Sequence, residues 1–371
     1  MNNNIMSVIF ASDNETKLNE LTIHRTTASL PFCGRYRFID FTLSNLVNSG
    51  ITTVGILTKN NYSSLMDHIR MGRDWDLNRK NNGIAVFPPY VSNTARSIYK
   101  GKIEGLYGII DYLDNAKEEY IIITNSNIAA NIDYDDVYDM HIKNGADITM
   151  LTYTAKTNTT RKVVVSSKTR GRVDELLISD TPSDKECEIG ANIYLFKKDL
   201  LRKLVEDAYT RGSIDFEQNI IQANASTLKI YAYPLTGYVA IIDDIKSYYN
   251  ESMKLLDTKE RDDLFFKNGK IFTKVKDSVP TVYRDKAEVK NSLIADGCDI
   301  NGKVENSILF RGVIVEEGAS IKDSIVMENG KVLKNACLSY VISDKNVTVK
   351  EDRQISGYAT YPVVIVKNKE V

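Results

Sequence analysis

The chain has 371 residues, of which 43% are hydrophobic and 26% charged, which is the balance of a globular protein long enough for two domains. Lys and Arg number 48 against 49 Asp and Glu, so the formal net charge of −1 provides no global excess that would attract nucleic acid or an anionic membrane. No apolar run approaches the roughly 18 residues of a membrane span, and the first five residues lack the features of a signal peptide, so we expect a cytoplasmic protein.

Cysteine and histidine are few and widely spaced. Without a CxxC pair or a His spacing typical of metal ligands, the sequence predicts reduced thiols, no structural zinc and no disulfide framework. The residues are Cys33, Cys187, Cys298, Cys337, His24, His68 and His141.

Segments with strand and helix periodicity alternate over roughly the first 256 residues. The expected strands are 7–10, 52–57, 120–124, 148–153, 163–166 and 192–196, and the expected helices are 38–49, 103–113, 134–143 and 245–256. Such alternation indicates an α/β domain with a mostly parallel sheet covered by helices on both faces.

The C-terminal part has a period of six residues instead. Apolar side chains recur at Leu309, Val315, Ile321, Met327 and Leu333. A six-residue repeat fits one side of each triangular coil of a parallel β-helix. We therefore expect an α/β domain over residues 1–257, a connector over 258–285 and a β-helix over 286–371. Four glycines would suit the corners of the coils: Gly297, Gly312, Gly318 and Gly330.

One stretch carries a family resemblance. Residues 31–51, PFCGRYRFIDFTLSNLVNSGI, resemble the block P-F-G-G-[KR]-[YF]-R-[IL]-I-D-F-x-L-S-N-x-x-N-S-G-I of the glucose-1-phosphate adenylyltransferases (ADP-glucose pyrophosphorylases). Matches at 58–59, 99–101, 190–194 and 247–249 extend the resemblance over the whole chain. It implies a Rossmann-like, GT-A-like nucleotidyltransferase domain followed by a left-handed β-helix of hexapeptide repeats. It also implies a role in glycogen or starch synthesis, because that family makes ADP-glucose from ATP and glucose 1-phosphate as tetramers.

The family's phosphate-binding loop is altered in this chain. The family pattern after the first strand is A-G-G-x-G-x-R-L, whereas residues 11–18 here read ASDNETKL. Side chains replace the glycines that let amide groups approach a phosphate, and a like-charge contact at about 4 Å costs about 4 kcal/mol at an effective dielectric near 20. Lys17 stands for the family's Arg, and Thr27 for its phosphate-reaching Lys. The remnant of the loop then consists of Ser12, Asp13, Glu15, Lys17 and Arg25.

The metal-binding carboxylates and the sugar-phosphate lysine are altered as well. By the resemblance, Asn127 takes the place of the Asp that binds Mg²⁺ after the strand 120–124, and Ile241 takes the place of the second Asp. A shift of the alignment would bring Asp243 to that second position instead. The family's E-K-P segment corresponds to 178–182, which contains no Lys, and Lys185 is out of register.

The losses fall at every point that nucleotidyl transfer requires. The resemblance then implies a noncatalytic, regulatory or activating subunit that assembles with a catalytic GlgC-type chain in a heterotetramer, with a homo-oligomer possible when the chain is alone. Mg-ATP would belong to the catalytic partner, and we expect no metal or cofactor on this chain. Arg35, Arg37 and Lys59 are candidates for a site that binds a phosphorylated effector, although Arg37 is also placed to pair with Asp40, three residues on.

Three other functions compete with this interpretation. The first is a self-sufficient nucleotidyltransferase that uses unusual ligands, namely Asn127, Asp243 and Lys17. The second is a sensor that binds a sugar nucleotide without turnover. The third, a hexapeptide-repeat acyltransferase, usually needs a histidine base on the β-helix, and no histidine follows His141.

Overall fold

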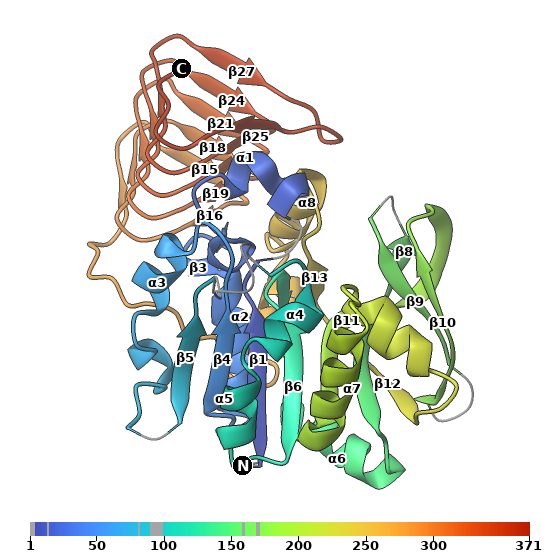
Figure 1. Ribbon diagram of the computed structural model, residues 1–371. Helices are drawn as coiled ribbons and strands as arrows, with labels where there is room; N and C mark the ends of the chain where they lie inside the picture. Colours follow the sequence, from blue (N-terminus) through green and yellow to red (C-terminus); the bar gives the residue numbers. More distant parts are fainter. Residues whose placement is uncertain (1–3, 13–14, 81, 90–98, 158–159, 168–170) are drawn as a thin grey trace.

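A nine-stranded sheet and a β-helix, both visible in Figure 1, account for most of the computed structural model. The structure describes residues 4–12, 15–80, 82–89, 99–157, 160–167 and 171–371. Within those ranges, every helix is too short or too polar to cross a membrane.

The nine-stranded sheet has the order β10-β9-β11-β6-β1-β4-β5, and β8 pairs with both β11 and β12. Strands β5, β4, β1 and β6 run parallel, whereas β11 is antiparallel to β6. The carboxyl ends of the parallel strands therefore meet at one edge of the sheet, where ligands bind in open α/β sheets. The strands are β1 (Ile5–Phe10), β4 (Thr53–Leu57), β5 (Gly83–Phe87), β6 (Tyr120–Asn125), β8 (Ile148–Thr157), β9 (Lys162–Ser167), β10 (Val173–Ser179), β11 (Ser183–Lys197) and β12 (Ile230–Pro234).

Helices cover both faces of this sheet, as the sequence predicts. One face packs against α2 (Phe38–Asn48), α3 (Ser63–Ile69) and α6 (Tyr134–Asn144), and the other against α4 (Lys102–Tyr107), α5 (Ile110–Asn115) and α7 (Lys198–Thr210). Side chains alternate along β1, so Ile5 and Ile9 join the first core while Met6, Val8 and Phe10 join the second. All the expected strands, and the helices other than 103–113, are confirmed. Three further helical turns are η3 (Arg73–Trp75), η5 (Glu217–Ile221) and η6 (Gln222–Asn224).

The single helix expected over 103–113 is wrong, because the chain forms α4 and α5 in its place. The first helix closes with bonds from the Gly108 N–H to the Glu104 carbonyl and from the Ile109 N–H to the Leu106 carbonyl. Glycine is less favourable than alanine inside a helix by about 1 kcal/mol, and Ile109 leaves helical geometry with a ψ of 20°. The apolar spacing is still that of one buried face, since both helices contribute to the same core.

Short elements connect the sheet to the β-helix. They are η1 (Glu15–Leu18), α1 (Asn19–Thr22), η2 (Thr27–Ser29), β2 (Pro31–Phe32), β3 (Tyr36–Arg37), β7 (Ile128–Ala130), β13 (Val239–Ile241), α8 (Ile245–Lys254) and α9 (Thr258–Phe266). A third core contains Leu21, Tyr248 and Leu264 from these elements together with Ile308 and Met327 from the β-helix. The junction between the two parts of the chain is therefore an apolar interface.

The C-terminal part is the expected left-handed parallel β-helix, built from three five-stranded sheets. The sheets are β14-β17-β20-β23-β26, β15-β18-β21-β24-β27 and β16-β19-β22-β25-β28. Their strands are β14 (Val282–Tyr283), β15 (Glu288–Lys290), β16 (Leu293–Ile294), β17 (Asp299–Ile300), β18 (Lys303–Glu305), β19 (Ile308–Leu309), β20 (Ile314–Val315), β21 (Ser320–Lys322), β22 (Ile325–Val326), β23 (Lys331–Val332), β24 (Cys337–Ser339), β25 (Val341–Ser343), β26 (Thr348–Val349), β27 (Gln354–Ser356) and β28 (Val363–Ile365).

The repeat inside the β-helix is not a uniform six residues. Ile308 pairs with Ile325 on the next coil, and the neighbouring Ser307 and Ser324, which are hydrogen-bonded across the same two coils, are 17 residues apart. One side of this coil is therefore a residue short of the expected repeat. Val326 and Val332 consequently fill the interior, whereas the expected interior residues Met327 and Leu333 do not. Met327 points outward into the junction core, and Leu333 is only half-buried.

The corners of the coils use residues with positive φ. Gly297, Gly312 and Gly318 have φ values of 78°, 69° and 76°, as predicted. The prediction for Gly330 is wrong, since Asn329 takes the positive φ there, at 59°. Asn329 also donates from Nδ2 to Oδ1 of Asn346 at 3.2 Å, which links successive coils. Gly330 is needed for space instead, because a Cβ atom there would lie 2.5 Å from a side-chain atom of β22.

Candidate functional site

The segment after β1 lies at the carboxyl edge of the parallel strands. Ser12 is half-buried, and its Oγ has no hydrogen-bond partner within the part of the chain that the structure describes. Asp13 lies outside the described residues, and so does the side chain of Glu15, whose backbone begins η1. Lys17 is exposed and donates from Nζ to Thr160 Oγ1 at 3.3 Å, which connects this segment to the start of β9.

Arg25 does not belong to the nucleotide loop. Its guanidinium turns toward the β-helix, where Nη2 lies 2.9 Å from Asp344 Oδ1 and both side chains are at most 3% exposed. A second nitrogen, Nη1, donates to the Leu21 carbonyl at 3.3 Å. Thr27 is fully buried in η2. The prediction that Arg25 is a loop remnant is wrong, because Asp344, a partner 319 residues away, holds it at the junction.

The predicted metal positions lie close together on the β7–β13 ladder. Asn127 directly precedes β7 and donates from Nδ2 to the Ile242 carbonyl at 3.1 Å, while the Ile242 N–H donates to the Asn127 carbonyl at 2.9 Å. Ile241 pairs with Ile128 and packs against the apolar core below. Asp243 is buried and forms an ion pair with Lys162.

This arrangement does not fit Mg²⁺. Mg²⁺ is held by carboxylate oxygens together with substrate phosphates and water. Here Asn127 provides a neutral amide that donates to a carbonyl, Ile241 is apolar, and the charge of Asp243 is balanced by Lys162. Across the described ranges, no cluster of three or more His, Cys, Asp or Glu side chains is placed to hold a metal ion.

A cavity of about 190 Å³ adjoins this ion pair. Three cations line it, and each has an acidic partner: Lys102 with Glu217, Arg161 with Asp215, and Lys162 with Asp243. The remaining lining residues are Val163, Ile178, Gly190 and Asn192. The sequence analysis missed Lys162, which lies 81 residues from Asp243 and has no motif of its own. Lys185 does not line the cavity.

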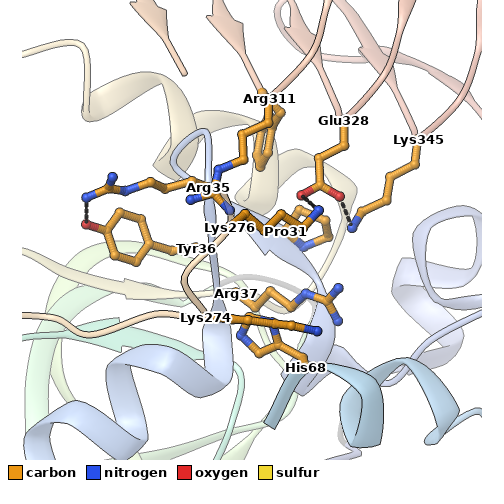
Figure 2. A pocket seen from close by; sticks show the side chains of 11 residues that line it. Pro31, Arg35, Tyr36, Arg37, His68, Lys274, Lys276, Arg311, Glu328 and Lys345 are labelled. Atoms are coloured by element: carbon orange, nitrogen blue, oxygen red, sulfur yellow. Dashed lines mark hydrogen bonds and ion pairs between the residues drawn. The ribbon is translucent and has the colours of Figure 1, made fainter. Parts of the chain in front are cut away.

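A second cavity lies at the junction of the two parts of the chain (Figure 2). Six cationic side chains line it, together with one acid, Glu328, and with Pro31, Tyr36, His68 and Phe310. The six cations are Arg35, Arg37, Lys274, Lys276, Arg311 and Lys345. We call this set, with Glu328, the cationic pocket.

Two of the three residues predicted for an anion site line the cationic pocket. Arg35 and Arg37 lie in it, but Lys59 does not; its Nζ lies 4.9 Å from the centre of the Tyr99 ring instead. The Arg37 side chain does not pair with Asp40. Its Nη1 donates to the Ser64 carbonyl at 2.7 Å, and only its main-chain N–H reaches Asp40.

Asp40 instead pairs with His68 at the base of the pocket. The His68 Nε2 and Asp40 Oδ1 atoms are 2.5 Å apart. Burial lowers the pKa of His68, and the Asp40 carboxylate only partly opposes this effect. The pairing keeps the carboxylate of Asp40 out of the cationic pocket.

The pocket residues that sequence analysis missed come from the connector and the β-helix. Lys345 follows Glu328 by 17 residues, and Arg311 precedes Glu328 by the same interval, so the three side chains stack on successive coils. The Asn329 and Asn346 N–H groups donate to the Arg311 and Glu328 carbonyls beside them. In the sequence, charged residues that recur every 17 residues, rather than every six, would have indicated this column. Lys274 and Lys276 follow α9 and offer no such signal.

Charges in the pocket shift one another's pKa values. Burial raises the pKa of Glu328, but Lys345, Lys276 and Arg37 outweigh it and lower that pKa to about 2. Burial, followed by the charge of Arg37, lowers the pKa of Lys345 to about 8, although Glu328 opposes both. Burial also lowers the pKa values of Arg37 and Lys274. A single carboxylate therefore does not balance the positive charge of this pocket.

Comparison with known proteins gives matches over both parts of the chain. The sequence model of the nucleotidyl transferase family matches residues 6–258, and that of the GlmU-like, C-terminal hexapeptide family matches residues 278–359. The glycogen biosynthesis protein GlgD of Bacillus subtilis is 33% identical over 99% of this chain and 96% of its own length. A glucose-1-phosphate adenylyltransferase of Fervidobacterium nodosum is 32% identical over 95% of this chain and 85% of its own. The Clostridium perfringens enzyme of that name is 32% identical over 88% and 85%, respectively.

Proposed function

Because the chain belongs to the nucleotidyl transferase family, among the glucose-1-phosphate adenylyltransferases and GlgD proteins, we propose that it is a noncatalytic subunit acting in glycogen biosynthesis. In this proposal the chain has lost the site for nucleotidyl transfer. It assembles with a catalytic GlgC-type chain in a heterotetramer, and it raises the activity of that chain or changes its regulation. Mg-ATP binds to the catalytic partner.

The observation that carries this proposal is the state of the β7–β13 ladder. The reaction joins ATP and a sugar phosphate, so charge must be neutralised as one phosphate attacks another. In this chain Asn127 is bonded to a carbonyl, Ile241 is apolar and Asp243 is paired with Lys162. No pair of available carboxylates is left at these positions to hold a divalent cation.

The cationic pocket supports the regulatory part of the proposal. Phosphate groups are recognised by Arg and Lys side chains that converge from different elements. Arg35 and Arg37 come from the β2–β3 hairpin, Lys274 and Lys276 from the connector, and Lys345 from the β-helix. A phosphorylated metabolite bound there would touch both parts of the chain at once.

The test is ADP-glucose synthesis from ATP and glucose 1-phosphate with Mg²⁺. It compares the purified chain, the cognate catalytic chain, and the two chains co-expressed. We expect no turnover by this chain alone, and a higher rate or altered effector response by the co-expressed pair. An Asn127→Ala, Asp243→Asn variant should stimulate the catalytic chain as the unmodified chain does.

Robust turnover by the purified chain, abolished by that same double variant, would overturn the proposal. It would favour the self-sufficient enzyme, in which Asn127 and Asp243 bind the metal. Size-exclusion chromatography with light scattering of the co-expressed chains tests the assembly separately, and two separate homo-oligomers would contradict the heterotetramer.

One observation supports a second candidate, a sensor of sugar nucleotides. The cavity of about 190 Å³ beside Lys162 combines paired charges with Gly190 and Asn192, in the segment that resembles the family's G-A-N. A sensor would bind ADP-glucose without a metal, because the Asp243 carboxylate is already paired with Lys162. Calorimetric titration of ADP-glucose in the presence of EDTA, with the unmodified chain and with Arg161→Gln, distinguishes the two, since Arg161 lines this cavity and not the cationic pocket. A sensor should lose affinity in that variant, whereas binding in the cationic pocket should be unchanged.

A further inference from the structure

We propose that Glu328 is a built-in counter-anion that closes the cationic pocket, and that the pocket opens only to an anion with at least two negative charges, such as a phosphate ester, which displaces the Glu328 carboxylate. This inference rests on the proposed function, since it concerns the same effector site. It adds the charge class of the ligand and the residue that the ligand must displace.

Free space between the side chains of the pocket is small. The cavity is about 30 Å³, which is room for no more than a few water molecules. A phosphate group that binds at full depth among these cations therefore requires a side chain to move. Figure 2 shows Glu328 reaching from the β-helix to lie between Lys276 and Lys345. The side chain that must move to make room is therefore the one acid of the pocket.

The Glu328 carboxylate already holds two of the pocket's lysines. Glu328 lies 2.6 Å from Lys345 Nζ and 3.3 Å from Lys276 Nζ, so it accepts from the two lysines that a phosphate would need. Its side chain is 15% exposed and that of Lys345 is 13% exposed, so water screens this pair only weakly. A monoanion that displaced the Glu328 carboxylate would put one negative charge beside the lysines in place of another. A dianion would add a second negative charge, so its attraction to the remaining cations would exceed that of Glu328.

Cations outnumber the available carboxylates around Glu328. Two other acids near the pocket are already engaged, because Asp296 Oδ2 lies 3.0 Å from Arg311 Nε and Asp40 is paired with His68. A third, Asp67, attracts Arg37 and Lys274 only from beyond ion-pair distance. Arg37 also acts on Glu328, and neither Arg37 nor Lys274 has a carboxylate within ion-pair distance among the described residues. Arg37 donates to Ser64 and Lys274 to the Asp67 carbonyl, both of which are neutral acceptors.

The test is calorimetric titration of the full chain with inorganic phosphate at constant ionic strength. We expect Glu328→Gln, which keeps the shape and removes the charge, to bind phosphate at least about tenfold tighter than the unmodified chain. Glu328→Asp, whose shorter side chain withdraws from the lysines, should fall between them. Glu305→Gln is the matched control, since Glu305 is a half-exposed acid on the same β-helix, away from the pocket, and it should bind as the unmodified chain does.

The site of binding is read from the chain's single tryptophan, Trp75. Its ring lies 5.8 Å from that of His68, which lines the pocket. Trp75 fluorescence should therefore titrate with the same midpoint as the heat. Lys276→Gln in the Glu328→Gln background should weaken the binding, and unchanged affinity there would place the phosphate elsewhere and overturn the inference.

The remaining outcomes separate this inference from the proposed function. If the unmodified chain and Glu328→Gln bind phosphate with equal affinity, Glu328 is not a gate, but the effector site stands. If neither they nor Glu328→Asp bind phosphate, both the gate and the effector site fail. If sodium chloride at matched ionic strength competes as well as phosphate does, the dianion requirement is wrong.

Discussion

The ion pair between Arg25 and Asp344 offers the sharpest test of how the two parts of the chain are joined. The pair spans 319 residues, has a separation of 2.9 Å, and is at most 3% exposed on either side. Removal of one partner of a buried pair leaves an uncompensated charge, which typically costs about 3–5 kcal/mol. Arg25→Met and Asp344→Asn should each lower the free energy of unfolding by about that amount.

The double variant isolates the interaction itself. Because each single variant already loses the pair, Arg25→Met with Asp344→Asn should cost less than the sum of the two, with a coupling energy of about 2–3 kcal/mol. Urea unfolding followed by Trp75 fluorescence gives these values, provided that the slope of the transition is unchanged. The control is Arg284→Met, which breaks an exposed Arg–Asp pair on the β-helix and should have a much smaller effect even though that pair has two hydrogen bonds.

The outcome also decides between two roles for Arg25. If Arg25 were part of a nucleotide loop, its removal would change stability little. An Arg25→Met effect no larger than that of Arg284→Met, or a coupling energy near zero, would refute the assignment of Arg25 to the junction.

Three further predictions follow from burial and backbone geometry. Val332→Asp should unfold the β-helix or cost more than about 3 kcal/mol, whereas Leu333→Asp should cost about 1 kcal/mol or less, and equal effects would contradict the shortened coil. Gly330→Ala should destabilise by about 1–3 kcal/mol, because its Cβ would meet atoms at 2.5 and 3.1 Å. Gly108→Ala, in helical geometry and with a Cβ that would make only ordinary contacts at 3.4 and 3.5 Å, should stabilise by about 0.4–1 kcal/mol in thermal unfolding. Burial lowers the pKa of His141 to about 4, from a value near 6.5 in the unfolded chain. As pH drops from about 6.5 to 4 the unfolded chain therefore binds the proton first, and the free energy of unfolding should fall. His141→Gln should reduce this dependence on pH, as measured by urea unfolding at each pH.

The sheet and its helices could be predicted because their signals are local. The apolar spacing along each segment records which face is buried, and β1 divides its side chains between two cores as the alternation requires. The break between α4 and α5 was missed because the apolar face continues through it, and only the weak helix propensity of Gly108 marks the boundary.

The candidate site was predictable only in part, for a different reason. A motif identifies residues near one another in sequence, so Arg35 and Arg37 were found, and Asn127 was located from its strand. The partners that define their chemistry are distant: Lys162 for Asp243, Asp344 for Arg25, and the β-helix column for Arg35. Only the folded chain brings such pairs together, because each position has no motif of its own.

The shortened side of these coils connects the fold to the site. If every side of the β-helix had the full repeat length, stacked positions would be 18 residues apart, and Arg311, Glu328 and Lys345, which are 17 apart, would not share one column. With the observed interval of 17 residues between Glu328 and Lys345, these two side chains and Arg311 remain in one column above the β2–β3 hairpin. The same short side turns Met327 outward to pack against the junction core. The coil length therefore sets both the apolar contact that fixes the two parts of the chain together and the charged column that completes the cationic pocket. An insertion of one residue between β21 and β22 should consequently weaken phosphate binding and the junction together. Loss of one without the other would show that the two are set separately.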